Sequence, residues 1–416
     1  MMADNNKSVL VVGFNTRPLA YSLKTAGYKV YAVDFFGDID LYPSVLDSFV
    51  LINELKTNYS SIKGSYSGIL AKYTIKMLKK YRDIDYLIIG SGLDDALEER
   101  KTILKEIKEG KYKIENLNND LNSIKNSRSI EQIYKYLKFH NYIVPVTIPY
   151  QIFKNYIHNL QFPIIFKKSK SAGGINVFKI NNYEELTELI EKFNPKQFNP
   201  LDWITQEYIE GNPISCTTIS NGRECEVISI NQQIIGEKKL YPPKEYMYCG
   251  NVVPIHLPKK VKNLIKAISK MLTISLGLKG INGFDYVLQN NYPYLMEVNP
   301  RIPGSIRASE LSYNINLLDL HIKSFNLSNW EYIQKSVSSM KSTGYATKLI
   351  MFSPKEIDRN LLAKINELEY VHDKSEPTKS VLKGEPLCTI LFKEKTLSES
   401  YNGAFKIIDK INKIIS

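Results

Sequence analysis

The stretch YPYLMEVNPRIPGS (Tyr292–Ser305) begins as an apolar strand and then turns polar. Glu297 and Asn299 occupy alternate positions near its end, and Arg301 follows two residues later. Because alternate residues of a strand lie on the same face, the carboxylate and the amide share one side of the sheet. The guanidinium continues this row if the strand extends that far. The stretch therefore predicts a row of chemically useful side chains on a strand that is otherwise buried.

The segment before this stretch supplies the other strand of a predicted hairpin. INGFDYVLQ and YPYLMEVNP are both typical of strands, and the turn between them falls at Asn290-Asn291. With a turn near residue 291, the numbers of paired residues add up to about 582, which places Asp285 opposite Glu297. Their Cβ atoms would then lie ~5 Å apart on one face of the sheet.

The two facing carboxylates indicate a bound cation. Neighbouring carboxylates repel each other unless a proton or a cation lies between them. The oxygen atoms of Asp285, Glu297 and Asn299 suit Mg²⁺, which takes one or two carboxylates and completes its shell with water and phosphate. The alternative is an exposed polar hairpin face that binds no metal.

A glycine-containing loop earlier in the chain favours a phosphate ligand. In FKKSKSAGGINVF, Lys167 and Lys168 lie at the end of a predicted strand, and a Ser/Gly-rich turn follows. The backbone N–H groups of residues 171–174 could surround phosphate oxygens, because glycine lets the backbone approach a ligand closely. The alternative is a flexible hairpin with solvated lysines. The loop is no Walker motif, since no GK[ST] opens a helix here.

The first hundred residues alternate between strands and helices. SVLVVGF (Ser8–Phe14), KVYAVDFF and DYLIIGSG (Asp85–Gly92) are predicted strands, and RPLAYSLKTAGY is a helix that ends at Gly27. This order predicts a parallel sheet with helices on its faces and binding loops after the strand ends. A nicotinamide dehydrogenase is disfavoured, because GFNTRP follows the first strand with Gly13 as its only glycine. Further along, SRSIEQIYKYLKFH (Ser127–His140) is predicted to be a helix capped by Ser127 or Ser129.

Composition limits the class of protein. A chain of 416 residues indicates two or three domains, and 43% hydrophobic with 24% charged residues is typical of a globular protein. We expect a cytoplasmic location, because the N-terminus lacks a signal sequence and no window reaches the ~18 apolar residues of a spanning helix. The net charge of +12 fits a lysine-rich surface, an anionic ligand or a nucleic-acid partner. The four cysteines form no CxxC pair, so reduced, buried thiols are expected.

Taken together, these motifs resemble the ATP-grasp superfamily, in particular its biotin carboxylase-like branch and the uncharacterised ATP-dependent carboligases. The resemblance extends from about Ser8 to the C-terminus and is most specific over Phe162–Ser305. FPIIFKKSKSAGGINV resembles the family's lysine-bearing strand and phosphate loop, and WITQEYIEG resembles its adenine segment. GFDYV…YLMEVNPRIPGS resembles its metal signature, and VLKGEPLCTILFK its closing segment.

The resemblance implies an ATP-grasp fold that combines α/β and α+β parts. It predicts an N-terminal parallel-sheet domain, a two-lobed ATP-grasp module and a small C-terminal α+β unit. The expected boundaries are residues 1–125, 126–325 and 326–416. Within the module, the phosphate-loop lobe would span about 145–208 and the metal-hairpin lobe about 209–325.

The resemblance also implies roles for individual residues. The ligands of Mg²⁺, or of Mn²⁺ in its place, would be Asp285, Glu297 and Asn299. The residues that bind ATP would be Arg128, Lys167, Ser171, Gly173, Gly174, Gln206, Glu207 and Ile209. The residues that act on the transferring group or the intermediate would be Lys167, Arg301 and Ser305, with Gly304 beside them.

Two positions depart from the family pattern. Arg128 stands where the family commonly has a lysine, and either cation binds phosphate. Many members hold the ribose with a glutamate shortly after the adenine segment, where this chain has Pro213. Recognition of the ribose is therefore open, with Glu210 as a weak substitute.

The implied activity is an ATP-dependent ligase that joins a carboxylate to an amine, or to a thiol in related members. The carboxylate would be activated as an acyl phosphate, ADP and phosphate would be released, and the loop at residues 169–174 would close over the intermediate. The partners would be small-molecule carboxylates and amines, with no nucleic acid and no membrane; a homodimer is left open. Gly236–Pro254 would face the substrates, whose identity the sequence does not determine.

Three alternatives stay open. A biotin carboxylase-like carboligase would use bicarbonate, a nucleotide-binding protein would have no catalytic activity, and a nucleic-acid binder would use the positive charge. A Ser-His or Cys-His nucleophile is not predicted, because none of the five histidines lies in a motif, and His140 and His256 are expected to be structural.

Overall fold

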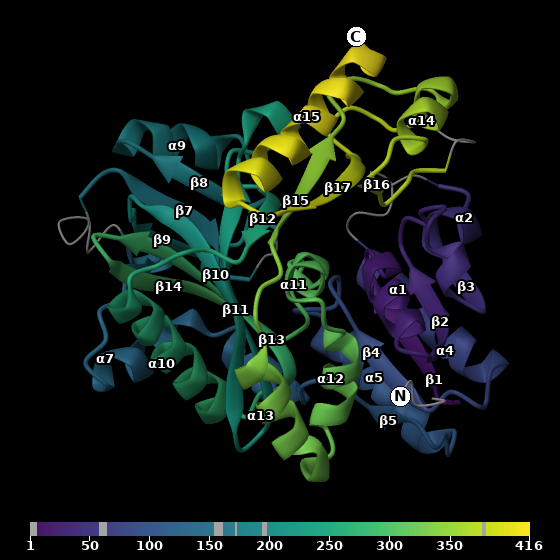
Figure 1. Ribbon diagram of the computed structural model, residues 1–416. Helices are drawn as coiled ribbons and strands as arrows, with labels where there is room; N and C mark the ends of the chain where they lie inside the picture. The colour runs from purple at the N-terminus through teal and green to yellow at the C-terminus, as the bar shows by residue number, and fades with distance from the viewer. Residues whose placement is uncertain (1–5, 58–64, 154–160, 171–172, 194–197, 377–379) are drawn as a thin grey trace.

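The computed structural model describes residues 6–57, 65–153, 161–170, 173–193, 198–376 and 380–416. Three β-sheets organise these residues, the first parallel and the other two antiparallel. In Figure 1 the first sheet lies at the right, the strands of the other two occupy the left and centre, and the C-terminal helix crosses the top. The fold is therefore α/β at the N-terminus and α+β in the remainder, as expected.

The N-terminal sheet has five parallel strands in the order β3 (Asp47–Val50), β2 (Lys29–Asp34), β1 (Ser8–Gly13), β4 (Tyr86–Ile89) and β5 (Glu115–Asn116). All residues of β1 are buried, because α1 (Arg17–Thr25) packs on one face of the sheet and α4 (Tyr66–Lys80) with α5 (Leu97–Glu109) on the other. The chain moves from β1 out to β3 and then returns to the opposite side of β1 at β4. At such a switch point, the loops after the two strands flank a crevice.

A four-stranded antiparallel sheet follows in the order β6 (Thr147–Pro149), β9 (Trp203–Glu207), β7 (Ile164–Lys168) and β8 (Val177–Ile180). Aromatic side chains fill its core, where the rings of Phe166 and Trp203 stack with centroids 4.6 Å apart. The helices α8 (Tyr150–Phe153) and α9 (Tyr183–Glu191) accompany it, and the side chain of Asn182 caps α9 by accepting a hydrogen bond from the backbone N–H of Glu185.

The third sheet has eight strands in the order β14 (Tyr292–Asn299), β13 (Lys279–Gln289), β10 (Asn212–Asn221), β11 (Cys225–Ile235), β12 (Tyr248–Val253), β15 (Tyr345–Phe352), β17 (Pro386–Glu394) and β16 (Val371–His372). The predicted antiparallel pair β10–β11 and the predicted hairpin β13–β14 are both present. The strands of the predicted C-terminal unit join this sheet, since β12 pairs directly with β15. The residue boundaries of the domains stay a prediction, but the strands that the structure describes within residues 326–416 belong to this third sheet.

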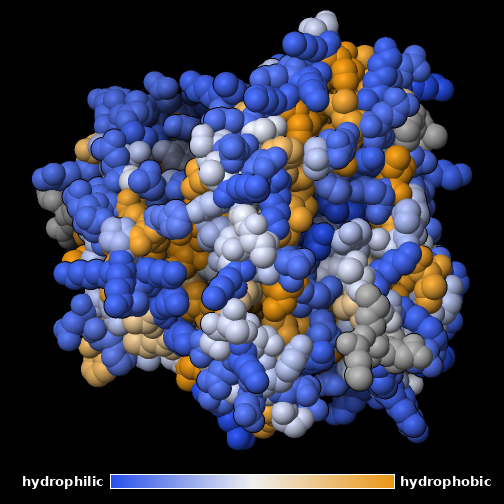
Figure 2. Space-filling model, viewed as in Figure 1, coloured by the Kyte–Doolittle hydropathy of each residue, from blue (hydrophilic) through white to orange (hydrophobic). Residues whose placement is uncertain are grey.

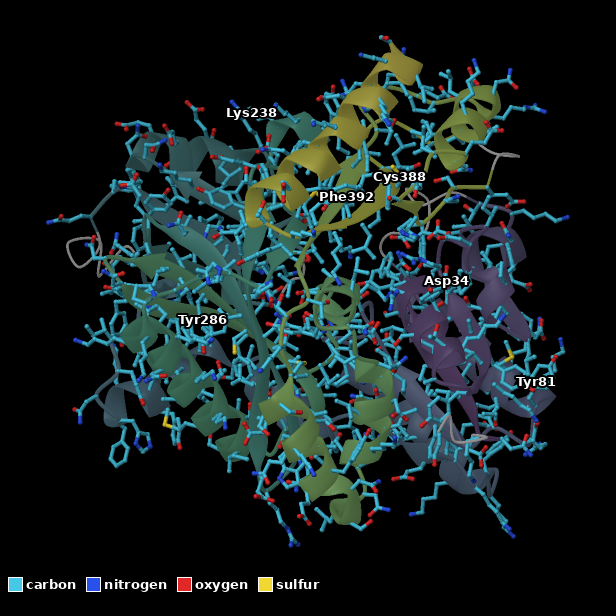
Figure 3. All side chains as sticks on the ribbon, viewed as in Figure 1. Asp34, Tyr81, Lys238, Tyr286, Cys388 and Phe392 are labelled. Atoms are coloured by element: carbon cyan, nitrogen blue, oxygen red, sulfur yellow. The ribbon has the colours of Figure 1, made fainter. Side chains whose placement is uncertain are left out.

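Helices cover the third sheet and connect it to the first. The longest of these helices, α10 (Lys259–Ser275) and the terminal α15 (Leu397–Ile415), each pack on a different part of this sheet. Tyr286 belongs to the core beneath α10 and Cys388 to the core beneath α15 (Figure 3). The others are α11 (Ile306–Tyr313), α12 (Leu317–Ser324), α13 (Trp330–Ser339) and α14 (Arg359–Asn366).

The predicted helix Ser127–His140 is wrong at its start. Ser127 ends one helix, α6 (Leu121–Ser127), and the next, α7 (Ile130–Phe139), begins three residues later. Ser129 takes the N-cap position of α7, but its side chain makes no capping hydrogen bond. Helical periodicity alone does not reveal this break, which leaves Arg128 in the junction between the two helices.

The surface and the thiols agree with the composition. Hydrophilic side chains predominate on the face shown in Figure 2, with apolar patches scattered between them. All four cysteines are buried and unpaired, as expected. Among the described residues, no helix combines the length and the apolar character that crossing a membrane requires.

Candidate functional site

A cleft of about 2320 Å³ lies between the three sheets. It receives Asn15 from the loop after β1, Lys167 from β7 and Lys348 from β15. Every described residue that the sequence assigns to ATP, to the metal or to the transferring group also lines it. Ser171 lies outside the described residues. The structure thus brings the predicted residues together, while their roles stay a prediction.

The hairpin pairs Asp285 with Glu297 as predicted, but it does so through a feature that the sequence argument missed. Asn290 and Asn291 have φ of 48° and 64°, so the turn has two left-handed residues, and Gln289 pairs with Tyr292. Continued regularly, this register would place Asp285 opposite the residue before Glu297. A register shift next to Asp285 inserts one extra residue into β14 and restores the pair. The bulge therefore places both carboxylates on the same face.

Asp285 is held by two amide donors. Asn299 Nδ2 donates to its Oδ2 at 2.8 Å, and Gln233 Nε2 on β11 donates to its Oδ1 at 2.9 Å. Burial, together with the charge of Glu297, raises the pKa of Asp285 to about 7. Desolvation and a neighbouring carboxylate both disfavour the charged form of a carboxyl group, so they raise its pKa.

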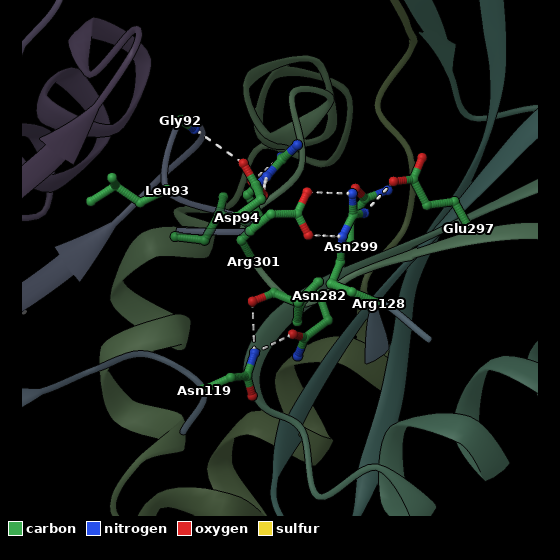
Figure 4. A network of polar contacts seen from close by, with 12 residues as sticks. Gly92, Leu93, Asp94, Asn119, Arg128, Asn282, Glu297, Asn299 and Arg301 are labelled. Atoms are coloured by element: carbon green, nitrogen blue, oxygen red, sulfur yellow. Dashed lines mark hydrogen bonds and ion pairs between the residues drawn. The ribbon is translucent and has the colours of Figure 1, made fainter. Parts of the chain in front are cut away.

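Arg128 connects the metal hairpin to the N-terminal sheet. Its Nε and Nη2 donate to the two carboxylate oxygens of Asp95 at 2.8 and 2.9 Å, and its Nη1 contacts Glu297 Oε1. The side chain is only 5% exposed. Burial by itself lowers the pKa of Arg128, but the charges of Glu297 and Asp95 outweigh it and hold the pKa above its usual value. Figure 4 shows the guanidinium directed at Glu297.

Lys167 lies on β7 and lines the cleft. Burial lowers its pKa to about 8, where Arg128 adds to the effect and Glu297 opposes it. Lys167 makes no ion pair with any residue that the structure describes, whereas the next residue, Lys168, lies 3.7 Å from Asp202. Both lysines line the cleft, but neighbouring strand residues point to opposite faces, so their ammonium groups differ in surroundings.

Arg301 leaves the end of β14 beside the N-terminal sheet. Its backbone N–H donates to Asn299 O at 2.8 Å, and its side chain contacts Asp94 Oδ1 (Figure 4). The strand exit is held by Asn119, whose Nδ2 donates to Pro300 O at 2.9 Å. The guanidinium therefore has a fixed position beside the two carboxylates of the hairpin.

Ser305 lies at the N-cap position of α11, deeply buried at 4% exposure. Its Oγ has no hydrogen-bond partner among the described residues. Nearby, Lys348 Nζ on β15 donates to Gly304 O at 3.0 Å. A buried hydroxyl without a partner at a helix N-terminus is suited to an anionic ligand.

Comparisons with known proteins agree with this arrangement. A family model described as the ATP-grasp domain matches residues 131–305. An uncharacterised protein of Methanocaldococcus jannaschii is 30% identical over 415 residues, which cover 94% of this chain and 90% of that protein. The chain belongs to the ATP-grasp superfamily. It is an ATP-dependent ligase whose cofactors are ATP and Mg²⁺.

Two further similarities extend over most of the ATP-grasp chain. The D-alanine–D-alanine ligase of Desulforamulus reducens is 23% identical, and the match covers 62% of this chain and 77% of that enzyme. The crystal structure of L-amino acid ligase from Bacillus licheniformis superposes with a TM-score of 0.68 at 16% identity, covering 97% of each chain. At that identity the superposition shows the fold alone.

The hairpin residues fit the metal of an ATP-grasp enzyme. Two carboxylates and an amide oxygen supply hard oxygen donors, and Asp285 is paired with Glu297 on the same face, where a divalent cation could lie between them. Among the described residues, no cluster of three or more His, Cys, Asp or Glu side chains competes as a metal centre. A site with two carboxylates suits Mg²⁺, which keeps water and phosphate in its remaining positions.

The phosphate loop of the ATP-grasp module touches the predicted substrate-facing segment. Tyr248 N donates to Gly173 O at 3.4 Å, and both Gly173 and Gly174 have positive φ, of 69° and 75°. A Cβ on Gly174 would lie 1.8 Å from the carbonyl oxygen of Tyr246. Glycine is thus required where the loop lies against the opposite wall of the cleft.

The adenine segment lines the cleft, although part of it already has structural partners. Gln206 is buried, and its Nε2 donates to the hydroxyl groups of Tyr134 and Thr147 at 3.1 and 2.9 Å. Glu207 Oε2 accepts a hydrogen bond from Val146 N at 3.0 Å, which fixes the neighbouring strand β6. The backbone N–H of Glu207 also donates to Val146 O, at 2.8 Å. These contacts shape the wall of the cleft, and the adenine contact stays a prediction.

Which residue would hold the ribose of ATP stays open. Pro213 lines the cleft, whereas Glu210 is exposed and is not among the lining residues. Glu210 therefore has no support as a ribose ligand.

Three charged residues of the site were missed by sequence reasoning. Asp94 and Asp95 come directly after a strong strand, in SGLDDAL, and the switch point of the sheet would have drawn attention to them. Lys348 interrupts the apolar strand YATKLIMF, which is the kind of local inconsistency that marks a functional position. Burial lowers the pKa of this lysine.

Proposed function

We propose that this ATP-grasp ligase activates a substrate carboxylate as an acyl phosphate and joins it to an amine, with release of ADP and phosphate, in the synthesis of a small molecule. The observation that carries the proposal is that Asp285, Glu297 and Asn299 share one face of the hairpin. The same cleft contains the cationic side chains of Arg128, Lys167 and Arg301. A site for Mg·ATP next to room for a second ligand supports transfer of a phosphoryl group to that ligand.

The chemistry requires an activated carboxyl group, because a carboxylate oxygen is a poor leaving group. A substrate carboxylate oxygen attacks the γ-phosphorus of ATP, and the bond to the bridging oxygen of ADP breaks. The amine nitrogen then attacks the acyl carbon, phosphate leaves with the bonding electrons, and the nitrogen gives up a proton. We assign to Lys167 and Arg301 the stabilisation of negative charge on the phosphoryl oxygens, with Mg²⁺ supplying the remaining positive charge when bound.

Exclusion of water is the second requirement, because an acyl phosphate hydrolyses readily. The contact between Gly174 and Tyr246 supports a closed arrangement in which the phosphate loop covers the cleft. Ser305, with its unpartnered buried hydroxyl, is our candidate for holding the anionic intermediate from the other side.

The relatives support amino-acid-like substrates. The D-alanine–D-alanine ligase is named for joining amino acids. We propose the same class, a carboxylate and an amine of small molecules, for this chain. The residues facing the substrates include Lys and Tyr side chains of the segment Gly236–Pro254, which suit anionic or zwitterionic ligands.

The proposal is tested by trapping the activated carboxyl group. Enzyme, Mg·ATP and pools of amino acids are mixed with hydroxylamine, which converts an acyl phosphate to a hydroxamate, and ADP is measured alongside. Carboxylate-dependent hydroxamate in amounts equal to ADP is expected, and the variant Glu297→Gln serves as the control. ADP release that depends on bicarbonate instead would support the carboligase alternative, and ADP release without any carboxylate dependence would refute the ligase proposal.

A further inference from the structure

The loop between β4 and α5 carries two consecutive carboxylates to which the proposed reaction assigns no role. Asp94 and Asp95 follow the carboxyl end of β4, at the switch point of the N-terminal sheet, and both line the cleft. Asp94 contacts Arg301 and Asp95 contacts Arg128. Each of the two guanidinium groups of the site therefore has its own carboxylate, and both carboxylates come from one short loop.

The loop has a fixed shape. Gly92 has φ of 108°, and a Cβ there would lie 2.7 Å from the ring of Phe14. Its backbone N–H donates to Asp94 Oδ2 at 3.1 Å. On the other side, the buried Arg100 of α5 donates from Nε to Leu93 O at 2.7 Å. The loop is thus attached to a strand end at one side and to a helix at the other, which allows it to position other groups.

Asp95 makes the more complete of the two contacts. It accepts hydrogen bonds from Nε and Nη2 of Arg128 at 2.8 and 2.9 Å, a bidentate arrangement that fixes the plane of the guanidinium as well as its place. Arg128 also contacts Glu297, a proposed metal ligand. If Glu297 binds the metal, Asp95 is a carboxylate that can keep its contact with Arg128 when the cofactors bind.

Asp94 holds Arg301 from the opposite side of the hairpin. Its Oδ1 contacts Arg301 Nε, and its Oδ2 is held by Gly92. Arg301 carries the proposed charge stabilisation at the transferring phosphoryl group, whereas Arg128 faces the nucleotide. One loop therefore contacts both guanidinium groups, and Figure 4 shows Asp94 beside Arg301.

We propose that Asp95 and Asp94 are positioning residues, and that Asp95 orients Arg128 toward the phosphates of the bound nucleotide while Asp94 orients Arg301 toward the γ-phosphoryl group. The inference rests on the proposed function for the roles of the two arginines. It makes the N-terminal domain, through a single loop, a part of the nucleotide site.

The test uses binding alone, so that it does not depend on knowing the substrates. Dissociation constants of Mg·ADP and of Mg·adenylyl imidodiphosphate, which keeps a γ-phosphoryl group, are measured by calorimetry for the full chain. Asp95→Asn is expected to weaken both ligands about tenfold. Asp94→Asn is expected to weaken the γ-phosphoryl-bearing analogue about fivefold and to leave Mg·ADP within about twofold.

Double variants distinguish positioning from a general loss of structure. If Asp95 acts through Arg128, Asp95→Asn should not weaken nucleotide binding further in a chain that already carries Arg128→Ala. The same is expected for Asp94→Asn in a chain that carries Arg301→Ala. Asp95→Glu should restore part of the lost affinity. The control is Asp85→Asn at the other end of β4, where Asp85 accepts hydrogen bonds from Lys7 Nζ and Ser8 N at 2.7 and 2.8 Å. Circular dichroism and the melting temperature are recorded for each variant.

Additive losses in the double variants would overturn the proposal, as would equal effects of Asp94→Asn and Asp85→Asn. If Asp95→Asn does not fold, Asp95→Glu alone must still weaken Mg·ADP measurably, and unchanged affinity in that variant would also overturn it. A chain that binds both nucleotides as described and forms no hydroxamate would contradict the ligase proposal while leaving this one supported.

Discussion

The titration of Lys167 gives the sharpest test of the nucleotide site. The residue is half-buried in the cleft without an ion-pair partner among the described residues, and desolvation lowers its pKa to about 8. Phosphate oxygens favour the charged form, so nucleotide binding should be strongest when the lysine is protonated. Raising the pH through 8 should therefore weaken binding, because the free enzyme loses the proton that the complex requires.

The size of the effect follows from this pKa. With a value of about 8, the charged fraction of Lys167 falls from about ten-elevenths at pH 7 to about one-eleventh at pH 9. If Mg·ADP binds only the charged form, its affinity falls about tenfold over this range. ADP itself contributes little, since a terminal phosphate with a pKa near ~6 is ionised throughout. At pH 9 the complex should take up nearly one proton per nucleotide bound.

Calorimetry measures both quantities. The dissociation constant of Mg·ADP is determined from pH 7 to 9, and titrations in buffers of different ionisation enthalpy give the number of protons taken up. Lys167→Arg is the matched control, because arginine stays charged at pH 9 and reports the pH dependence of every other group. Lys167→Met should bind weakly with the same shallow profile as Lys167→Arg. The reasoning is refuted if Lys167→Met retains the tenfold fall or if wild type takes up no proton at pH 9.

Three further predictions follow from single contacts. Glu297→Gln should lower turnover ~100-fold, since it removes a proposed metal ligand; unchanged turnover in a steady-state assay would remove the metal assignment. Gly174→Ala would place its Cβ 1.8 Å from the carbonyl oxygen of Tyr246 and should raise ADP release without ligation roughly fivefold. Gly173→Ala is the control, because it shares the positive φ and meets no atom within 4 Å. Burial lowers the pKa of His321 to about 4. Below pH 6.5 the unfolded chain binds a proton at this residue and the folded chain does not, so the free energy of unfolding should fall by about 3 kcal/mol between pH 6.5 and 4. Urea unfolding measures this change, and His321→Gln should reduce the pH dependence.

The metal hairpin was predictable because its pattern is local. Alternation along one strand and a two-residue turn are enough to bring Asp285 and Glu297 together. The bulge beside them was not predictable, since nothing in the residue pattern separates a regular hairpin from one with an inserted residue. The predicted pair was obtained because a turn assumed near residue 291 compensated for the missing bulge. Local periodicity thus identified the correct face of the strand, and the detailed register came only from the structure.

The contacts of Arg128 show where prediction from sequence ends. The residue could be assigned to the nucleotide by its position in the family pattern. Two of its partners, however, lie 33 and 169 residues away, one in the β4–α5 loop and the other on β14. Such contacts depend on how the domains pack, and no spacing rule along one chain contains that information. The same limit applies to Lys348 on β15, whose contact with Gly304 in the turn before α11 joins residues 44 positions apart.

The distribution of charge in the cleft explains why nucleotide and metal should bind as a pair. Asp285 and Glu297 would repel a bare triphosphate, while Lys167, Arg128 and Arg301 would repel a bare divalent cation. Asp95 and Asp94 partly neutralise the two arginines, so that the cations orient phosphate oxygens without an excess of positive charge. A ligand that brings a divalent cation between the carboxylates and phosphate oxygens to the lysine and arginines satisfies both sets of charges at once. Magnesium-bound ATP has this charge pattern, and the two acidic residues of the β4–α5 loop adjust the site to it.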